Sequence, residues 1–432
     1  VEAPIKEPEQ FSYSGTAVRH DKWWQAFNDP ILNTLIDSAL TKNLNLAIVW
    51  EQFQEAQAIR RRQASFLWPE AEISGRSAIS RPEPDFAGGE NIQLGLSVAY
   101  EFDLWGRLRS LKQAEAFRAQ ATYYDYQAAT LSLTAQISTT WFQLLTAQRQ
   151  LELAEKQIKT NEDIIKLIRA RFTSGQIRAV DILRQTQLLE TRRNQKILYE
   201  RNLELIKNQL SVLLGKPPQN GTEVVITSLP DLPPLPQVGL PLELVRRRPD
   251  VNRAYNLVLA ADRDMAAAIR NKYPRLSVSL AAQARSNTYQ SLFNEWAYTL
   301  AGNLVAPLFY GGRLKAEVDR TEAIKNQLLY SYGQTVLTSF REVEDALIRE
   351  IKQKERIEVL KRQLDLAQKV NGQLRIEFLN GLSNYLDVLL SLDQKQQLER
   401  DLIEAEQILL EIRIDLYRAL AGAFETQRSI NQ

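Results

Sequence analysis

The sequence predicts a mainly α-helical chain with a small β part, organised as a tandem duplication. Three observations predict this fold class. The same motifs recur at an almost constant offset, the first copy contains a long stretch without Gly or Pro that carries apolar heptads, and both copies contain short segments in which apolar and polar residues alternate. Long helices and four short strands are therefore expected in two equivalent halves.

The duplication is clearest at two Gly-containing turns and at the segments before them. Phe, Gly, Asp and Leu coincide at these turns at an offset of 206, and a second set of matches lies further upstream. A constant register over this distance indicates a repeated unit much longer than a solenoid repeat. The matches are 171–183 with 377–389, Gly106-Arg107-Leu108 with Gly312-Arg313-Leu314, and Trp68-Pro69 with Tyr273-Pro274 at an offset of 205.

Five parts of the chain follow from the repeats and the prolines between them. The stretch between the copies is rich in Pro, which is typical of a stiff extended segment. The parts are an N-terminal extended segment at 1–29, a first repeat at 30–215, a Pro-rich linker at 216–241, a second repeat at 242–422, and a C-terminal tail at 423–432.

Each repeat is expected to contain a helix, two strands, a long helix, a tight turn and a last helix. Pro30 can begin the first helix, which is expected to run to about Ala64. The later elements of the first repeat are strands 70–81 and 91–102, a long helix 107–172, a tip turn 173–178 and a helix 179–214. Those of the second are strands 274–286 and 296–307, a long helix 313–378, a tip turn 379–384 and a helix 385–421.

The long helix of the first repeat has no Gly or Pro from Leu108 to Arg171 and would measure roughly 95–100 Å. Such a length is typical of a coiled coil or a long bundle. A ladder of apolar residues supports this, although Asn161 interrupts the companion row beside it. Together the two shorter helices would match the long one, which suggests the wall of a cylinder. The ladder is Ile137, Leu144, Leu151, Ile158, Ile165 and Phe172.

The four strands leave two interpretations open. At about 11–12 residues they match the length of tilted strands that cross a bilayer. They could equally be two soluble hairpins packed on helices. Four strands cannot close a barrel in one chain, so the membrane interpretation requires several copies, and three copies would supply twelve strands.

Composition excludes several kinds of chemistry. The chain has no Cys and one His, His20, so thiol nucleophiles, disulfides and thiolate-bound zinc are excluded, and we predict no catalytic residue, cofactor or metal site. Lys and Arg number 54 against 52 Asp and Glu, a net charge of +2, which argues against nucleic-acid binding. Acidic residues on the helices alternate with Lys and Arg, which is typical of a solvated face. An enzyme is therefore not expected.

Several motifs occur together in a characteristic order. They are Trp23, Trp24, Phe27, Asp29, Pro30 and Leu32 near the start, Arg247-Arg248-Pro249-Asp250 at the opening of the second copy, and the two Phe-x-x-Gly turns followed by Asp181 and Asp387. In these motifs and their spacing the sequence resembles the TolC-like outer-membrane efflux proteins, specifically the OprM-type channels of tripartite pumps. The resemblance covers nearly the whole chain.

The resemblance implies a homotrimer with a twelve-stranded β-barrel in the bacterial outer membrane, four strands per chain, continued by a long α-helical barrel in the periplasm. Its function would be a passive exit duct for drugs or other small toxic compounds. The implied partners are a periplasmic membrane-fusion adaptor, an inner-membrane RND-type pump and outer-membrane lipid, without nucleic acid. Channels of this type commonly begin with a lipidated Cys, so a lipid anchor here would need a Cys before Val1.

The resemblance also implies a gate and an adaptor-docking site at the periplasmic tip. Three copies of Asp387 could form a ring of carboxylates, although Asp181 and Asp387 also suit the start of a helix. Some relatives carry a second Asp where this chain has Leu390, and some an Arg where it has Ser383, so we expect a mainly apolar seal. The expected gate residues are Asp387, Leu390, Phe378, Tyr385, Leu386 and Asp181. The expected docking residues are Gly175, Gly381, Thr173, Ser174, Asn380 and Leu382, and both glycines also suit a tight turn.

The main rival function is a soluble coiled-coil scaffold or a periplasmic adaptor protein. Such a protein would use the same heptads and would lack membrane strands. A channel should fractionate with outer membranes and require detergent, whereas a scaffold should not.

Overall fold

The computed structural model describes residues 5, 8–18, 21–79, 90–218, 229–422, 424 and 426. His20, most of the expected C-terminal tail, and parts of the N-terminal segment and the linker lie outside the described residues. The chain forms two compact units. The sheet unit comprises Val1–Ile5, Val49–Tyr126 and Asp250–Val336, and the hairpin unit comprises Lys6–Ile48, Gln127–Pro249 and Leu337–Gln432. In the described part of the chain, no helix combines the length and apolar character needed to cross a membrane.

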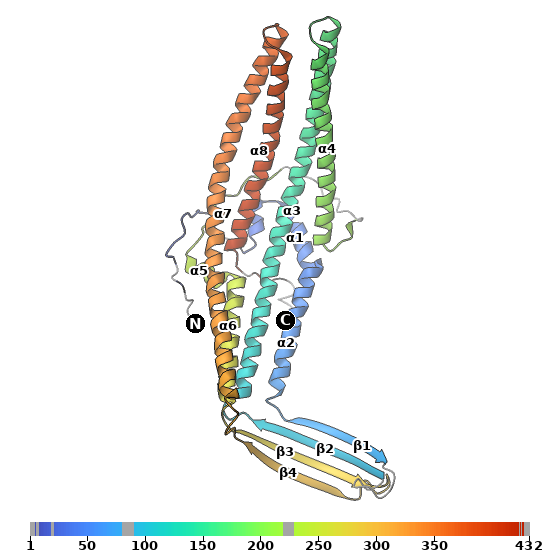
Figure 1. Cartoon of the computed structure of the whole chain (residues 1–432), viewed down its shortest axis with the longest axis vertical. Helices are drawn as coiled ribbons and strands as arrows, with labels where there is room; N and C mark the ends of the chain where they lie inside the picture. The colour runs from blue at the N-terminus through green and yellow to red at the C-terminus, as the bar shows by residue number, and fades with distance from the viewer. Residues whose placement is uncertain are drawn as a thin grey trace. The chain divides into compact units, whose positions relative to one another are not determined.

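The sheet unit contains one antiparallel sheet in the order β1-β2-β3-β4 (Figure 1). The mainly helical fold class and its four strands are thus confirmed. The expected residues 80 and 81 of the first strand lie outside the described residues, and the fourth strand ends two residues earlier than expected. The strands are β1 (Glu70–Ile79), β2 (Glu90–Phe102), β3 (Arg275–Ser286) and β4 (Trp296–Val305).

The two β-hairpins have the same register, which extends the duplication to the backbone pairing. Ile73 lies opposite Leu96 in the first hairpin, and the equivalent Val278 lies opposite Gly302 in the second. These pairs keep the offsets of 205 and 206 found in the sequence. The two copies meet where β2 pairs with β3, which we call the internal seam.

Two helices of equal length continue from the sheet. They are α3 (Arg107–Thr173) and α7 (Arg313–Leu379), each of 67 residues. The start of α3 is capped because the carboxylate of Asp103 accepts hydrogen bonds from the backbone N–H groups of Leu108 and Arg109 at 3.0 and 2.9 Å. Within the sheet unit, α3 is bonded to α6 (Pro249–Arg270) by an ion pair of 2.6 Å between Asp125 and Arg253.

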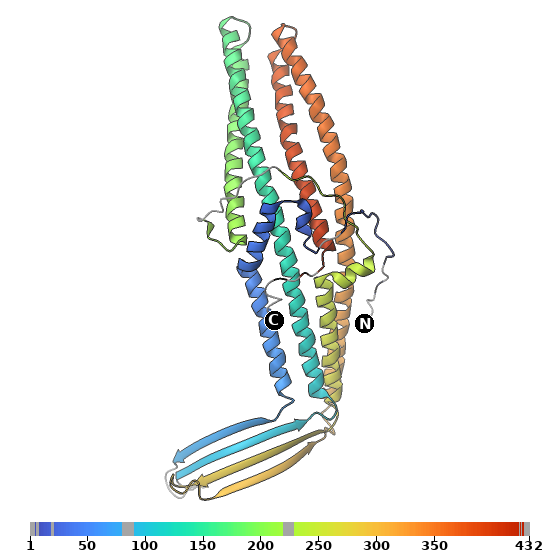
Figure 2. The same ribbon diagram turned by 180° about the vertical axis from the view of Figure 1, so that it is seen from behind.

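The hairpin unit contains two antiparallel helical hairpins that lie side by side (Figures 1 and 2). One joins α3 to α4 (Ala179–Leu213), and the other joins α7 to α8 (Tyr385–Leu420). The fully buried row on α3 is the companion row that includes Asn161, whereas the expected ladder becomes exposed toward its end, at Phe172. Phe172 is the last residue but one of α3, where the helix ends in the exposed tip turn.

The expectation of one continuous helix from Pro30 to about Ala64 is wrong. The helix is broken at Asn43 into α1 (Pro30–Lys42) and α2 (Leu44–Ser65). Asn43 has an extended backbone, with ψ 125°. Its Oδ1 accepts a hydrogen bond from the backbone N–H of Leu46, and its Nδ2 donates to the carbonyl of Leu213, both at 2.9 Å. A tertiary hydrogen bond and a helix cap therefore outweigh continuous helical pairing here.

The second copy has the equivalent break. Arg248, with ψ 127°, separates α5 (Pro241–Arg247) from α6, and the following Pro249 disfavours a helical conformation at this residue. Its Nη1 donates to the carbonyl of Ala419 at 3.3 Å. Ala419 is equivalent to Leu213 at the offset of 206. Each copy therefore bonds the break in its first helix to the end of its last helix.

Aromatic residues near the start hold the chain against the hairpin unit. The short 3₁₀ helix η1 (Trp23–Phe27) has three buried aromatic side chains, and the Trp23 ring stacks on that of Tyr417 at a centroid distance of 5.7 Å. Asp29 caps α1 through the backbone N–H of Ile31 at 2.9 Å and accepts the indole N–H of Trp141 at 2.7 Å. This motif therefore positions α1 on α3 and α8.

One buried ion pair holds the linker between the copies. Arg413 on α8 is 0% exposed and donates hydrogen bonds to both carboxylate oxygens of Glu350 on α7, at 2.8 and 2.6 Å. Its Nη1 also donates to the carbonyls of Pro233 and Pro234. The guanidinium therefore satisfies linker carbonyls that have few other donors nearby in a Pro-rich stretch.

Candidate functional site: the hairpin tips

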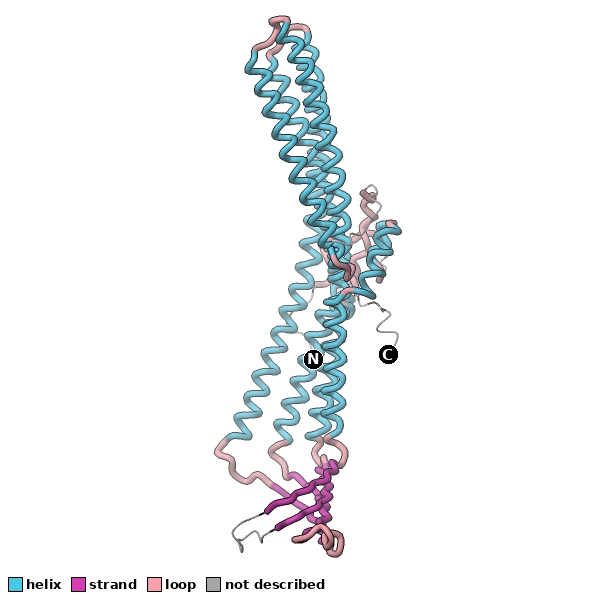
Figure 3. The backbone as a smooth tube through the Cα atoms, turned by 90° about the vertical axis from the view of Figure 1, so that its right-hand side faces the viewer, coloured by secondary structure: helices cyan, strands magenta, loops and turns pink. Residues whose placement is uncertain are grey.

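Each helical hairpin ends in a tip turn (Figure 3). The two turns have matching backbone geometry. Gly175 and Gly381 have φ values of +74° and +77°. The N–H of Gly175 donates to the carbonyl of Phe172 at 2.9 Å, and that of Gly381 to the carbonyl of Phe378 at 3.1 Å. A Cβ atom on either glycine would meet nothing within 4 Å, so the requirement for Gly comes from the left-handed backbone.

The remaining expected docking residues lie on these turns. Thr173 and Ser174 are exposed. Their hydroxyls donate hydrogen bonds to carbonyls of the preceding helical turn, Thr173 to Ala170 at 2.7 Å and Ser174 to Arg171 at 3.0 Å. Asn380 is exposed, and Leu382 is 78% exposed. The structure thus brings a polar first tip and a more apolar second tip to the ends of the two hairpins.

The two tips differ in charge although they are copies of each other. Residues 166–184 contain five basic residues and one acidic residue, whereas the equivalent residues 372–390 contain one basic and two acidic residues. The first tip is therefore strongly basic and the second slightly acidic. The basic residues of the first tip are Lys166, Arg169, Arg171, Arg178 and Arg184, and the charged residues of the second are Arg375, Glu377 and Asp387.

Asp181 lies inside the hairpin unit. Its residue is 3% exposed, and its carboxylate forms ion pairs with Arg178 at 3.2 Å and Arg184 at 3.7 Å. The backbone N–H of Arg178 also donates to this carboxylate at 3.4 Å. The charge of Asp181 is therefore compensated at the start of α4.

Tyr385 and its neighbours pack between the two hairpins. Tyr385 is 5% exposed, and its hydroxyl donates to the side-chain carbonyl of Gln185 at 2.6 Å. The centroid of its ring lies 5.4 Å from that of Phe378, and Leu386 is partly buried in the same hydrophobic cluster. Burial raises the pKa of Tyr385, and the negative charge of Asp181 raises it further. Three residues expected to form the seal thus lie within one chain, between its hairpins.

Asp387 and Leu390 are placed differently. Asp387 is exposed, its side chain has no ion pair or hydrogen bond with the residues that the structure describes, and Leu390 is 60% exposed. The duplication explains the contrast with Asp181. The places of Arg178 and Arg184 are taken in the second copy by Asn384 and Leu390, so Asp387 has lost both cationic neighbours.

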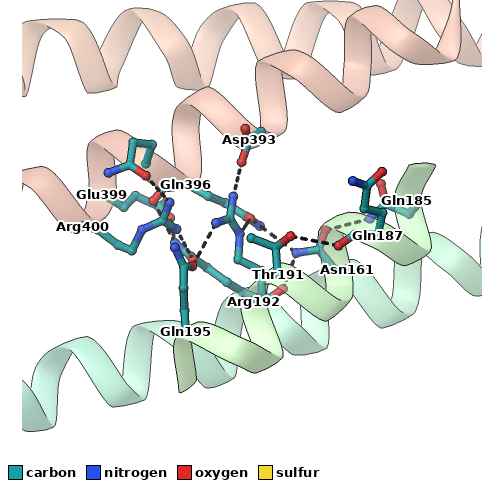
Figure 4. A network of polar contacts seen from close by, with 12 residues as sticks. Asn161, Gln185, Gln187, Thr191, Arg192, Gln195, Asp393, Gln396, Glu399 and Arg400 are labelled. Atoms are coloured by element: carbon teal, nitrogen blue, oxygen red, sulfur yellow. Dashed lines mark hydrogen bonds and ion pairs between the residues drawn. The ribbon is translucent and has the colours of Figure 1, made fainter. Parts of the chain in front are cut away.

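A buried chain of polar side chains begins at the tip and links the hairpins (Figure 4). The Nε2 of Gln185 donates to the Oδ1 of Asn161 at 2.7 Å. The Nδ2 of Asn161 donates to the Oε1 of Gln396 at 3.4 Å, and Arg192 donates to the same oxygen at 2.8 Å. Arg192, which is 2% exposed, also forms an ion pair with Asp393. These contacts join α3, α4 and α8, and we call them the polar seam.

Sequence reasoning did not predict the polar seam. Its one visible signal was Asn161, which interrupts an apolar row that is otherwise suited to packing. Further along the seam, Gln157 accepts from Arg400 at 2.8 Å and donates to the carbonyl of Gln396 at 3.1 Å. In the described part of the chain, no three His, Asp or Glu side chains are grouped so that they could hold a metal ion.

Known proteins share both the sequence and the fold. Residues 35–216 and 240–422 each match the family described as outer membrane efflux protein. The chain is 28% identical to the pyoverdine export outer membrane protein OpmQ of Pseudomonas aeruginosa, over 99% of this chain and 94% of that protein. It is also 28% identical to the solvent efflux pump outer membrane protein SrpC of Pseudomonas putida, over 93% and 87%. The structure superimposes on the outer-membrane channel OprN with a TM-score of 0.88 and 24% identity, over 98% of both chains.

Proposed function

Because the chain belongs to the outer membrane efflux protein family, and is thus an efflux channel of the bacterial outer membrane and not an enzyme, we propose that it is a passive exit duct gated at its hairpin tips. It is the outer membrane component of a tripartite efflux pump. In the proposed assembly, three copies pool their strands into a twelve-stranded barrel. The partners are a periplasmic membrane-fusion adaptor and an inner-membrane RND-type pump. Family membership decides against the rival soluble scaffold.

The observation that supports the gate is the pair of residues Asp387 and Leu390. Both are exposed on the first turns of α8, and the carboxylate of Asp387 has no cation beside it in the described part of the chain. In a threefold assembly, three such carboxylates around a narrow axis would attract cations and repel one another. The leucines would narrow the same opening. The buried Asp181 is a supporting residue in this proposal, because its charge is already paired.

Conductance in planar bilayers tests the gate. Asp387→Ala should lower the preference for cations, and Leu390→Ala should raise the conductance of the closed channel. Asp365→Ala is the matched control, because Asp365 is an acidic residue on α7 that is paired with Lys369 at 2.7 Å. Unchanged conductance and cation preference in both tip variants would contradict the proposed gate.

The exposed tip turns are proposed to bind the adaptor. Their support is the solvent-exposed turn geometry and the unequal charge of the two tips, which would favour acidic groups beside the first tip. Arg169 is an exposed residue of that tip. Arg169→Glu should weaken co-purification of the adaptor with the detergent-solubilised channel, and Arg375→Glu in the second tip is the matched comparison. Equal retention of the adaptor by both variants and the unchanged protein would contradict this docking mode.

The cargo is proposed to be drugs or other small toxic compounds. The relatives named above export pyoverdine and solvents, and both are small organic molecules. In the proposed assembly the inner-membrane pump selects the cargo. If this channel is replaced by a related channel while the inner-membrane pump is kept, the set of exported compounds should then stay the same.

A further inference from the structure

One face of the four-stranded sheet carries small and polar side chains. Along β2 it alternates with an apolar face, because successive side chains of a strand point to opposite sides. A Cβ atom on Gly95 would lie 3.0 Å from the hydroxyl oxygen of Ser74 on β1 and 3.8 Å from the Cγ of Gln283 on β3, so these three residues share one face. We call it the polar face. Its members on β2 include Gln93, Gly95, Ser97, Ala99 and Glu101.

The strand register brings two arginines into one row of the polar face. Arg76 on β1 lies opposite Gln93 on β2, and Gln93 lies opposite Arg285 on β3. Both arginines are exposed. Neighbouring strands lie about 4.7–4.9 Å apart, so the backbones at the two arginines are separated by about 10 Å. We call these three residues the basic row, and it lies near the end of the sheet where each hairpin turns.

The other end of the polar face, beside the helices, is mainly acidic. Glu70 and Glu72 on β1 are both exposed. Glu101 on β2 is also at this end, and it is paired with Arg107 at 2.8 Å. Arg275 begins β3 and adds one basic residue. The polar face therefore changes from mainly acidic beside the helices to basic beside the turns of the hairpins.

The arginines are the main charges that the structure describes at the basic row. Glu295, which precedes β4 and is exposed, is an acidic residue at the same end of the sheet, and the two arginines outnumber it. Residues 80–89, between β1 and β2, lie outside the described residues. The next polar-face row toward the helices is uncharged and consists of Ser74, Gly95, Gln283 and Ala297.

We propose that the basic rows of three chains form a ring of six arginines inside the barrel, near its outer opening, which attracts small anionic compounds and repels cations. Barrels in membranes place apolar side chains toward lipid and polar ones toward the interior, so the polar face lines the duct. Rings of Arg or Lys are typical of pores that favour anions. Guanidinium groups bind carboxylates and phosphates through two parallel hydrogen bonds, and these are the anions expected to be favoured.

The ring gives the exit a charge preference opposite to that of the proposed gate. Three copies of Asp387 would favour cations at the tip, whereas the six arginines favour anions where the cargo leaves. At 0.1 M salt the field of a charge is screened over about 10 Å, so the ring acts on compounds that pass close to the wall. The inference rests on the proposed threefold assembly, and adds to it the charge preference of the exit.

Thiol reagents of opposite charge test the sign of the potential, because the chain has no Cys of its own. Gln93→Cys places a reporter between the two arginines, and Ser97→Cys places one opposite Glu72, on the same strand and the same face. The trimer in lipid nanodiscs is labelled with 2-sulfonatoethyl methanethiosulfonate, an anion, or with 2-(trimethylammonio)ethyl methanethiosulfonate, a cation. Relative to a free thiol in solution, Gln93→Cys should react faster with the anion and Ser97→Cys with the cation.

Removal of the arginines should abolish the preference for the anion at Gln93→Cys. In low salt, Arg76→Gln and Arg285→Gln should each lower the ratio of anionic to cationic labelling rates by about three- to tenfold, as expected for unit charges about 6–10 Å apart in water. Arg275→Gln is the matched control, since Arg275 lies on the same strand and face as Arg285 but roughly 33 Å away. It should leave the ratio unchanged.

A reporter on the apolar face distinguishes two ways in which the inference could fail. Lipid should protect Leu96→Cys from both charged reagents. If Leu96→Cys is protected and Gln93→Cys shows no preference for the anion, or keeps that preference without the arginines, the ring is overturned while the proposed assembly stands. Labelling of Leu96→Cys together with protection of Gln93→Cys would overturn both, because the polar face would then not line the duct.

Block of the current tests the consequence for anions. Inorganic tripolyphosphate, a multivalent anion, should lower the current in planar bilayers at low salt when it is added on the barrel side. The block should weaken as the salt concentration is raised, because ions screen the ring. The double variant Arg76→Gln, Arg285→Gln should need several times more tripolyphosphate for the same block. Equal block of this variant and the unchanged channel, or no block of either, would overturn the inference.

Discussion

Tyr385 on α8 and Gln185 on α4 are joined by a buried hydrogen bond of 2.6 Å between the two helical hairpins. The bond continues the polar seam, because the same Gln185 donates to Asn161 on α3. Separation of the hairpins at the tip would replace this bond by hydrogen bonds to water, at a net cost of about 0.5–1.5 kcal/mol. The hydrogen bond therefore opposes movement of α8 away from α4.

Tyr385→Phe should make the closed tip easier to open. The substitution keeps the ring that packs against Phe378 and removes only the hydroxyl. In planar bilayers we expect a higher mean conductance at the same voltage. Tyr330→Phe is the control, because Tyr330 is 68% exposed. The same conductance in both variants and the unchanged channel would show that this bond does not hold the tip.

The charge of Asp387 should be neutralised by restoring the arginines of the first copy. The double variant Asn384→Arg, Leu390→Arg places cations where Arg178 and Arg184 flank Asp181. We expect a loss of cation preference at least as large as that of Asp387→Ala, although the carboxylate remains, because each chain then carries two positive charges beside one negative charge. Reversal potentials in a salt gradient measure the preference. A double variant that stays as cation-selective as the unchanged channel would contradict a role for the uncompensated charge.

Asn43 should contribute to stability through both of its hydrogen bonds. Asn43→Ala removes the cap of α2 and the bond to Leu213, and should destabilise the protein by about 1–2 kcal/mol from the cap alone. Asn43→Ser keeps an oxygen that can cap α2 but has no amide group to reach the carbonyl of Leu213, so this variant should lose less stability than Asn43→Ala. Thermal unfolding followed by helical circular dichroism gives the order. Equal melting temperatures for the two variants would contradict separate contributions.

The Glu350–Arg413 pair should make stability depend on pH in the acid range. Burial alone raises the pKa of Glu350, but hydrogen bonds from Arg413 and Lys354 outweigh it, and the net pKa lies below the ordinary 4.5. The pair's contribution is therefore fully present above pH 4.5 and is lost as the pH falls through the lowered pKa.

Glu350→Gln tests this dependence. The variant leaves Arg413 buried without its counter-ion and should be destabilised by about 3–5 kcal/mol at neutral pH. The gap between its melting temperature and that of the unchanged protein should narrow below pH 4.5. A gap that stays constant from pH 7 to pH 3 would contradict the assignment.

The elements that could be predicted from sequence are those with a periodic signal over many residues. The strands alternate in polarity, and α3 has no Gly or Pro between Leu108 and Arg171, so both were found. The break at Asn43 was not found, because it depends on a carbonyl 170 residues away. Local sequence contains no signal for such a tertiary hydrogen bond.

Some features of the tip residues could be predicted from the sequence and others could not. The turns around Gly175 and Gly381 follow from chemistry that is local to each turn. The burial of Tyr385 could not be predicted, because it depends on how two hairpins pack. The contrast between Asp181 and Asp387, however, was present in the sequence as the replacement of two arginines, and a residue-by-residue comparison of the copies would have shown it.

The equal lengths of α3 and α7 bear on how the two copies have diverged. Both helices have 67 residues, and the change of offset from 205 to 206 falls between the two strands of a hairpin, since Ile79 and Glu90 enclose one residue fewer than Ala284 and Trp296. One inserted residue would rotate everything beyond it in a helix by about 100°. A protein with an epitope tag between the strands of a hairpin should therefore still fold. One extra residue in the middle of α3 should instead prevent folding, because it would turn the buried face of the helix away from its neighbours.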